Sequence, residues 1–205
     1  MMVATKVYIF KHLVFLTLLA ISALCANAQD YDKGEAAYKA GNYKTAFEEL
    51  LPLAEGDDAW AQYFVGSMYE HGKGVIQNDA EAAKWYRLAA DQGNAFGQFN
   101  LGFMYEDGRG VIQNDVEAVK WYRLSADQGN AFAQNNIGLM YEYGNGVIQS
   151  NVMAHMWYNI SSTSGYEDAP TWRDEISRKM TREDISKAQS MAQECVSSGY
   201  KNCGD

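Results

Sequence analysis

A short sequence in this chain occurs twice, with a spacing of 36 residues. The segment Val75–Asp79 returns as Val111–Asp115, and the segment Lys84–Arg87 returns as Lys120–Arg123. A third, more divergent copy begins at Val147 with the same offset. A fixed period of this length is typical of repeat proteins, in which each unit buries its apolar face only by stacking on the next unit. The period therefore predicts a solenoid, and it favours a binding scaffold over a catalytic domain.

Each unit is predicted to contain two helices. In the first unit, apolar residues recur at helical spacing across residues 58–71, and Gly72 and Gly74 allow the left-handed backbone of a helix end and a tight turn. A second helix is expected to begin at Asn78, which can cap it while Glu81 reaches back to the capping residue. The second unit repeats these signals, so we predict an all-α fold.

The chain outside the leader is expected to form one domain, in which three repeats lie between two capping segments. Pro52 should bend or shorten the second helix of the N-terminal capping pair, and Thr181 should cap the last helix. A polar outer face on the terminal segments is what a solenoid needs at its ends. The expected boundaries are 29–58 for the N-terminal capping pair, 61–96, 97–132 and 133–168 for the repeats, and 169–205 for the C-terminal cap.

Residues 1–28 have the pattern of a signal peptide. A basic start is followed by the apolar run Leu13–Leu24 and by the small-residue site at Ala26 and Ala28. The run is shorter than the ~20 residues that a membrane-spanning helix needs. We therefore expect an exported protein, periplasmic or secreted after cleavage near Ala28, without a membrane span in the mature chain. A retained anchor, or a lipid on Cys25, is the alternative.

The charge of the chain argues against nucleic acid as a partner, and its cysteine content fits an exported protein. The formal net charge is −9, and it falls to −11 without Lys6 and Lys11, so binding to the phosphate backbone of nucleic acids is disfavoured. Once the leader is removed, Cys195 and Cys203 remain, eight residues apart near the C-terminus. In an oxidising compartment they can form a disulfide that holds the tail against the last helix. Two unpaired thiols are the alternative.

The repeated positions resemble the Sel-one-like repeat (SLR) family, a relative of the tetratricopeptide repeat. The resemblance implies a right-handed αα-superhelix of helix-turn-helix units, which usually serves as an adaptor for a peptide or protein. A cysteine-rich branch of the family is linked to β-lactam binding, but this chain lacks those cysteines, so that activity is not carried over. In the second unit the matching residues are Gly102, Tyr105, Gly108, Gly110, Val111, Asp115, Lys120, Trp121, Tyr122, Ala126 and Gly129.

The same resemblance implies that the first helix of each unit lines a concave groove. Six of the ten differences between the first two units lie in that helix, which fits a surface that varies with its ligand. Aromatic side chains rimmed by carboxylates would suit a peptide with apolar residues and a Lys or Arg. The predicted groove residues are Tyr63, Ser67, Glu70, His71, Phe99, Phe103, Glu106, Asp107, Asn135, Leu139, Glu142 and Tyr143.

Two other interpretations of these positions stay open. Phe99 and Phe103 can instead pack between helices, with the three glutamates as solvated surface charge. Recurring aromatic residues at a further position are expected to pack between units. These are Trp60, Phe96 and Phe132.

The sequence gives little support to a catalytic or metal site. His71 and His155 lie in different units, and neither has a nucleophile in its sequence context. Met153, His155 and Met156 could ligate a soft metal, but they do not converge on one helix face. We therefore predict no enzyme activity, no cofactor and no metal. A β-lactam or peptidoglycan-related module and an envelope protein without a specific ligand remain the rival classes.

Overall fold

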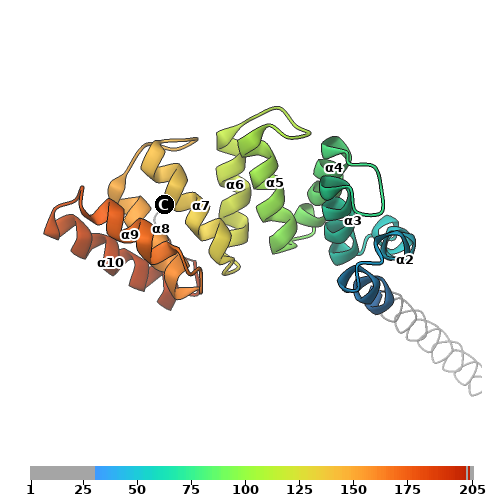
Figure 1. The fold of residues 1–205 in the computed structure, drawn as a ribbon. Coiled ribbons are helices and arrows are strands. Elements are labelled where there is room, and N and C mark those ends of the chain that lie inside the picture. The colour runs from blue at the N-terminus through green and yellow to red at the C-terminus, as the bar shows by residue number, and fades with distance from the viewer. Residues whose placement is uncertain (1–30, 202, 204–205) are drawn as a thin grey trace, which may run out of the picture.

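The computed structural model describes residues 31–201 and 203, and this part of the chain is built from helices and connecting turns without strands. The predicted signal peptide therefore lies outside the described residues. The helices follow one another as an arched row of hairpins (Figure 1). A helical stretch at 31–39 precedes α2 (Tyr43–Glu55), α3 (Ala59–His71), α4 (Asp79–Asp91), α5 (Ala95–Asp107), α6 (Asp115–Ala126), α7 (Ala131–Tyr143), α8 (Asn151–Thr163), α9 (Ala169–Ser177) and α10 (Arg182–Ser197).

Each repeat is one hairpin that packs on the next. The helices α3 and α4, α5 and α6, and α7 and α8 pair within units, while α4 contacts α5 and α6 contacts α7 between units. The second helix of one unit therefore lies against the first helix of the following unit. The predicted all-α solenoid of helix-turn-helix repeats is confirmed. Among the helices described, none has both the length and the apolar character needed to cross a membrane.

Within each unit the two helices approach closely because a glycine faces a tyrosine ring. A Cβ added to Gly102 would lie 2.7 Å from Cδ1 of Tyr122, and the same contact recurs between Gly66 and Tyr86. The rings of Tyr86 and Tyr122 are fully buried. The glycine therefore makes room for a large apolar ring, whose burial supplies much of the packing energy of the hairpin.

The loop between the two helices of a unit rests on the preceding unit. Gly110 has a φ of 68°, and a Cβ at this position would lie 2.1 Å from the backbone oxygen of Asp79, the first residue of α4. Gly146 makes the equivalent approach to Asp115, at 2.4 Å. Both the left-handed backbone and the missing side chain are required here.

Two local expectations need correction. Asn78 caps α4 by accepting hydrogen bonds from the backbone N–H groups of Ala80 and Glu81, but its own N–H donates to the carbonyl of Tyr69. Glu81 pairs with Lys84 instead of closing a capping box. Pro52 does not shorten α2, which has 13 residues, as α3 has. It lies in the last turn, where the loss of one backbone donor leaves the rest of the helix intact.

The C-terminal segment closes the solenoid over α8. Thr181 caps α10 by accepting a hydrogen bond from the backbone N–H of Asp184 at 3.1 Å. A disulfide joins Cys195 of α10 to Cys203, which follows the helix, with 4.6 Å between their Cα atoms. Both cysteines are buried in the same apolar cluster as Trp157.

Replacing both cysteines by alanine should lower the free energy of unfolding by about 2–3 kcal/mol, because the crosslink closes a short loop in the unfolded chain. Urea denaturation of the purified, oxidised protein followed by circular dichroism measures this change. A reducing agent should lower the midpoint of the wild type and leave that of the double variant unchanged. Equal sensitivity of the two proteins to the reducing agent would contradict the crosslink.

Candidate binding face

The first helices of the three repeats carry a row of aromatic rings that runs from unit to unit. The ring centroids of Trp60 and Phe96 are 5.5 Å apart, those of Phe99 and Phe132 are 6.1 Å apart, and Phe132 is 5.2 Å from Tyr166. These contacts join α3, α5, α7 and the turn before α9. We define the aromatic row as Trp60, Tyr63, Phe96, Phe99, Phe132 and Tyr166.

Three members of this row are much more exposed than large aromatic side chains usually are. Trp60 is 47% exposed, Phe96 is 43% exposed and Phe132 is 55% exposed. The sequence predicted that these three pack between units, and Trp60 does contact Phe96 across a unit boundary. The prediction missed the half of each side chain that remains open to solvent. The recurrence of an aromatic residue every 36 residues was the sequence signal that could have pointed to an exposed row.

The predicted groove residues Tyr63, Phe99 and Asn135 lie deeper. Tyr63 and Phe99 are partly buried, with ring centroids 6.1 and 5.7 Å from Tyr86 and Tyr122 respectively. Asn135 is 4% exposed, and its buried side-chain oxygen has no hydrogen-bond partner. Tyr63 and Phe99 therefore pack on the tyrosine of their own hairpin and stay partly accessible, whereas Asn135 is buried.

The second predicted row, Ser67, Phe103 and Leu139, is partly buried throughout. Phe103 packs against the apolar cluster that contains Trp157, and Leu139 packs against the cluster that contains Ile176 of α9. The residues near the turn behave differently, because His71, Asp107 and Tyr143 are all exposed. The predicted groove residues therefore all lie on the first helices, but among these rows only His71, Asp107 and Tyr143 are exposed throughout.

The three glutamates are bonded within their units, so they are not simply solvated surface charges. The hydroxyl of Tyr86 donates to Glu70 at 2.6 Å, that of Tyr122 donates to Glu106 at 2.6 Å, and that of Tyr158 donates to Glu142 at 2.9 Å. Burial raises the pKa of each tyrosine hydroxyl, and the adjacent carboxylate raises it further. Each hydroxyl therefore stays a hydrogen-bond donor.

Two of these glutamates also hold a cation from elsewhere in the chain. Arg109 donates to Glu70 at 2.8 Å and to Asp79 at 3.0 Å, and Lys179 donates to Glu142 at 3.0 Å. The hydrogen bond to Asp79 raises the pKa of Arg109. The Arg109 bridge ties the loop of the second unit to both helices of the first.

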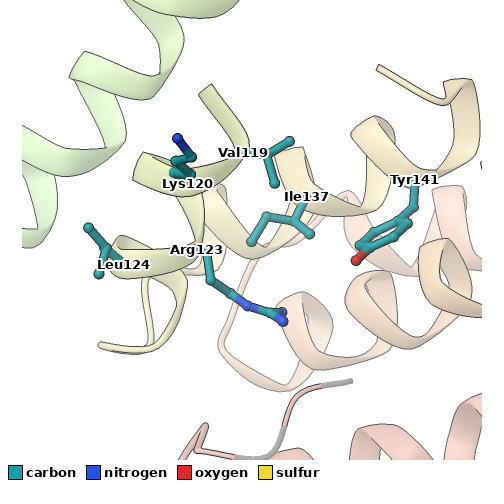
Figure 2. Close-up of a pocket in the computed structure, with 6 residues that line it drawn as sticks. All are labelled: Val119, Lys120, Arg123, Leu124, Ile137 and Tyr141. Carbon is teal, nitrogen blue, oxygen red and sulfur yellow. The ribbon is translucent and has the colours of Figure 1, made fainter. Parts of the chain in front are cut away.

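A separate apolar cavity of about 380 Å³ lies between α6 and α7. Figure 2 shows its lining, which includes Arg123, Leu124 and Tyr141. In the preceding unit the equivalent arginine, Arg87, donates to the hydroxyl of Tyr105. Arg123 donates instead to the backbone carbonyl of Cys203, at 3.0 Å, and lies 4.8 Å from the ring of Trp157. In the second unit the arginine is therefore bonded to the C-terminal tail, and both Arg123 and Tyr141 line the cavity.

The repeat loops add a second exposed apolar feature that the sequence analysis did not single out. One isoleucine in each loop is almost completely exposed: Ile76, Ile112 and Ile148, at 90%, 91% and 91%. A metal site has no support of this kind: residues 31–201 and 203 contain no group of three or more His, Cys, Asp and Glu side chains that could hold an ion.

Comparison with known proteins gives consistent matches to one kind of repeat. The model of the Sel1 repeat matches residues 61–94, 95–130 and 131–166. A crystal structure of a Sel1 repeat protein from Oxalobacter formigenes is 30% identical, with a TM-score of 0.64, and covers 82% of this chain and 74% of its own.

A protective antigen of uropathogenic Escherichia coli with an SLR fold is 27% identical over 85% of this chain, with a TM-score of 0.78. An exopolysaccharide production negative regulator of Rhizobium meliloti (strain 1021) is 38% identical over 60 residues, or 29% of this chain. The match spans only 39% of the E. coli antigen and 22% of the regulator.

Proposed function

The chain belongs to the Sel1 repeat family, whose members generally mediate protein–protein interactions, and from this premise we propose that it is an exported scaffold that holds a peptide or protein segment on its first helices. Such scaffolds are typically non-catalytic, and we assign this chain no reaction. The mechanism is rigid presentation: packed hairpins fix the binding surface before the partner arrives, so little ordering entropy is lost on binding.

The observation that carries this proposal is the exposure of Trp60, Phe96 and Phe132. Each ring is held by its neighbours but keeps about half of its surface open. Aromatic side chains in this situation are the anchors that dominate binding energy at protein interfaces. A row that crosses three units gives an elongated surface, which suits an extended segment better than a compact ligand.

Export rests on the leader pattern of residues 1–28, and the crosslink between Cys195 and Cys203 supports it, because disulfides persist in oxidising compartments. N-terminal sequencing of the protein recovered from the periplasmic or secreted fraction tests this part of the proposal. A mature chain that begins near residue 29 is expected. Full-length protein retained in the cytoplasm would contradict it.

The triple variant Trp60→Ala, Phe96→Ala and Phe132→Ala tests the binding face. We expect the affinity for the natural partner to fall about 100-fold or more, because several hot-spot side chains are removed together. The partner is identified by crosslinked pull-down from the exported fraction, and affinity is then measured with the purified pair. The far-ultraviolet circular dichroism of the variant should match that of the wild type, since the rings are half exposed.

The repeat offers a matched control. The triple variant Ile76→Ala, Ile112→Ala and Ile148→Ala also removes three exposed apolar side chains with the same spacing, but from the loops. It should leave partner capture unchanged. If the loop variant abolishes capture and the aromatic variant does not, the first helices are not the binding face. If no partner is captured by the wild type, the protein is a structural component without a specific ligand.

A further inference from the structure

The middle repeat lacks a cation that the other two repeats have. Glu70 binds Arg109, and Glu142 binds Lys179. Glu106 is the equivalent glutamate of the second unit, and within residues 31–201 and 203 no Lys or Arg side chain reaches it. The difference appears in the burial of these residues. Glu70 and Glu142 are each 9% exposed under their cations, whereas Glu106 is only partly buried.

The missing cation corresponds to one residue in the sequence. Arg109 lies between Gly108 and Gly110, and 36 residues later Asn145 occupies the same place between two glycines. The carboxylates follow the same step, since Glu70 and Asp79 correspond to Glu106 and Asp115. An asparagine side chain is too short and carries no charge, so it cannot replace the bridge that Arg109 makes.

The backbone around the two positions is the same. Gly110 approaches the backbone oxygen of Asp79, and Gly146 approaches the backbone oxygen of Asp115 in the same way. Asn145 is therefore held at the position equivalent to that of Arg109, and Glu106 and Asp115 occupy the positions equivalent to those of Glu70 and Asp79. The first unit thus shows which chemical group the equivalent pair, Glu70 and Asp79, binds.

The unfilled position is electrostatically unfavourable for the protein alone. Burial raises the pKa of Glu106, the hydrogen bond from Tyr122 lowers it, and the nearby charges of Asp107 and Asp115 raise it. The whole chain is also acidic, with a formal net charge of −9. A cation supplied from outside would relieve repulsion that no neighbouring residue relieves, and it would be attracted by the field of the whole protein.

We propose that Glu106 and Asp115 form a binding site for an arginine side chain of the partner segment, in the place that Arg109 fills in the preceding unit. This inference rests on the proposed binding function and names the chemistry of its ligand. Arginine fits better than lysine, because its planar fork can contact two carboxylates at once, as Arg109 contacts Glu70 and Asp79.

The distance between the aromatic row and the proposed arginine site predicts how far apart the apolar residue and the arginine lie in the partner segment. Phe99, Phe103 and Glu106 are separated by four and three residues, so they share one stripe along α5. The seven residues from Phe99 to Glu106 span about 10 Å along the helix. An extended peptide covers that distance in about three residues. The partner segment should therefore carry a large apolar or aromatic residue about three positions from its arginine.

A phage library of random dodecapeptides tests this inference on the mature protein. Selection on the wild type should enrich arginine about three positions from an aromatic or large apolar residue. In a selected synthetic peptide, exchange of the arginine for citrulline keeps the size and removes the charge, and it should weaken binding about tenfold or more in fluorescence anisotropy.

Variants of the protein give the complementary test. Asn145→Arg supplies the missing cation from the chain itself, so it should weaken binding of the arginine peptide about tenfold or more and raise the melting temperature by about 2–4 °C. Asn145→Gln is the matched control, and it should change neither quantity. Glu106→Gln should also lose the preference for arginine over citrulline.

The outcomes separate this inference from the proposed function. Selected peptides without enriched arginine, or an arginine peptide that binds Asn145→Arg and Glu106→Gln as tightly as the wild type, would overturn the site at Glu106. If such peptides still depend on Trp60, Phe96 and Phe132, the binding face stands without it. If no peptide is enriched and the natural partner does not depend on the aromatic row, both proposals fail.

Discussion

Replacement of Trp157 by alanine should lower the free energy of unfolding by about 3–5 kcal/mol, which is the usual cost of removing a large buried aromatic side chain. Trp157 is fully buried, and it lies in one apolar cluster with Ala188, Ala192 and Cys195 of α10. Its loss would leave a cavity between α8 and the C-terminal cap. It would also remove the ring over which Arg123 lies. Urea unfolding followed by tryptophan fluorescence and circular dichroism measures the change.

Trp85 is the matched control, because it occupies the same repeat position two units earlier and is only partly buried. Trp85→Ala should cost clearly less than Trp157→Ala, since less apolar surface is lost from the core. Equal losses would mean that the C-terminal cap does not pack on Trp157 as the structure describes.

Replacement of Gly110 by alanine is expected to cost about 2–5 kcal/mol, from two effects that add. A non-glycine residue in the left-handed region costs about 1–2 kcal/mol. The new Cβ would also lie 2.1 Å from the backbone oxygen of Asp79, so the loop must move away from α4, and overpacking of this kind costs about 1–3 kcal/mol. The displaced loop would strain the Arg109 bridge to Glu70. Thermal and urea unfolding of the variant measure the sum.

Gly93 separates the two effects. Its φ is 87°, and nothing lies within 4 Å of a Cβ built there, so Gly93→Ala should show the backbone strain alone, about 1–2 kcal/mol. If Gly93→Ala and Gly110→Ala are equally destabilised, the loop of the second unit is not seated on α4.

The sequence was most informative where the signal is local. The first helix was predicted over 58–71, and α3 runs from Ala59 to His71 with Asp58 as its cap. Helix spacing, the capping side chain and the terminal glycine all lie within one hairpin, so they can be recognised without knowing how the hairpins stack. The repeat then implies the stacking, since a hairpin with one apolar face needs a neighbour.

Contacts between units were not predictable in the same way. The glutamates were expected either to rim the groove or to be solvated surface charges, but Glu70 is bonded to Arg109, 39 residues along the chain. Such a pairing depends on the distance between adjacent hairpins, which the sequence does not encode at any one position. The exposure of Trp60, Phe96 and Phe132 depends on the same stacking. A comparison of position 109 with position 145 was the one signal that could have revealed the irregular middle unit.

The link from Arg123 to the carbonyl of Cys203 gives the molecule unequal ends. In a solenoid each unit is stabilised mainly by its neighbours, so fraying starts from a terminus. Here the C-terminal side is held by the disulfide and by the guanidinium of Arg123 from the middle repeat, whereas near the opposite end Pro52 removes one backbone donor from the last turn of α2. Unfolding should therefore begin at the N-terminal hairpin and proceed from unit to unit toward the C-terminus, and the third repeat under the crosslinked cap should be the last to unfold.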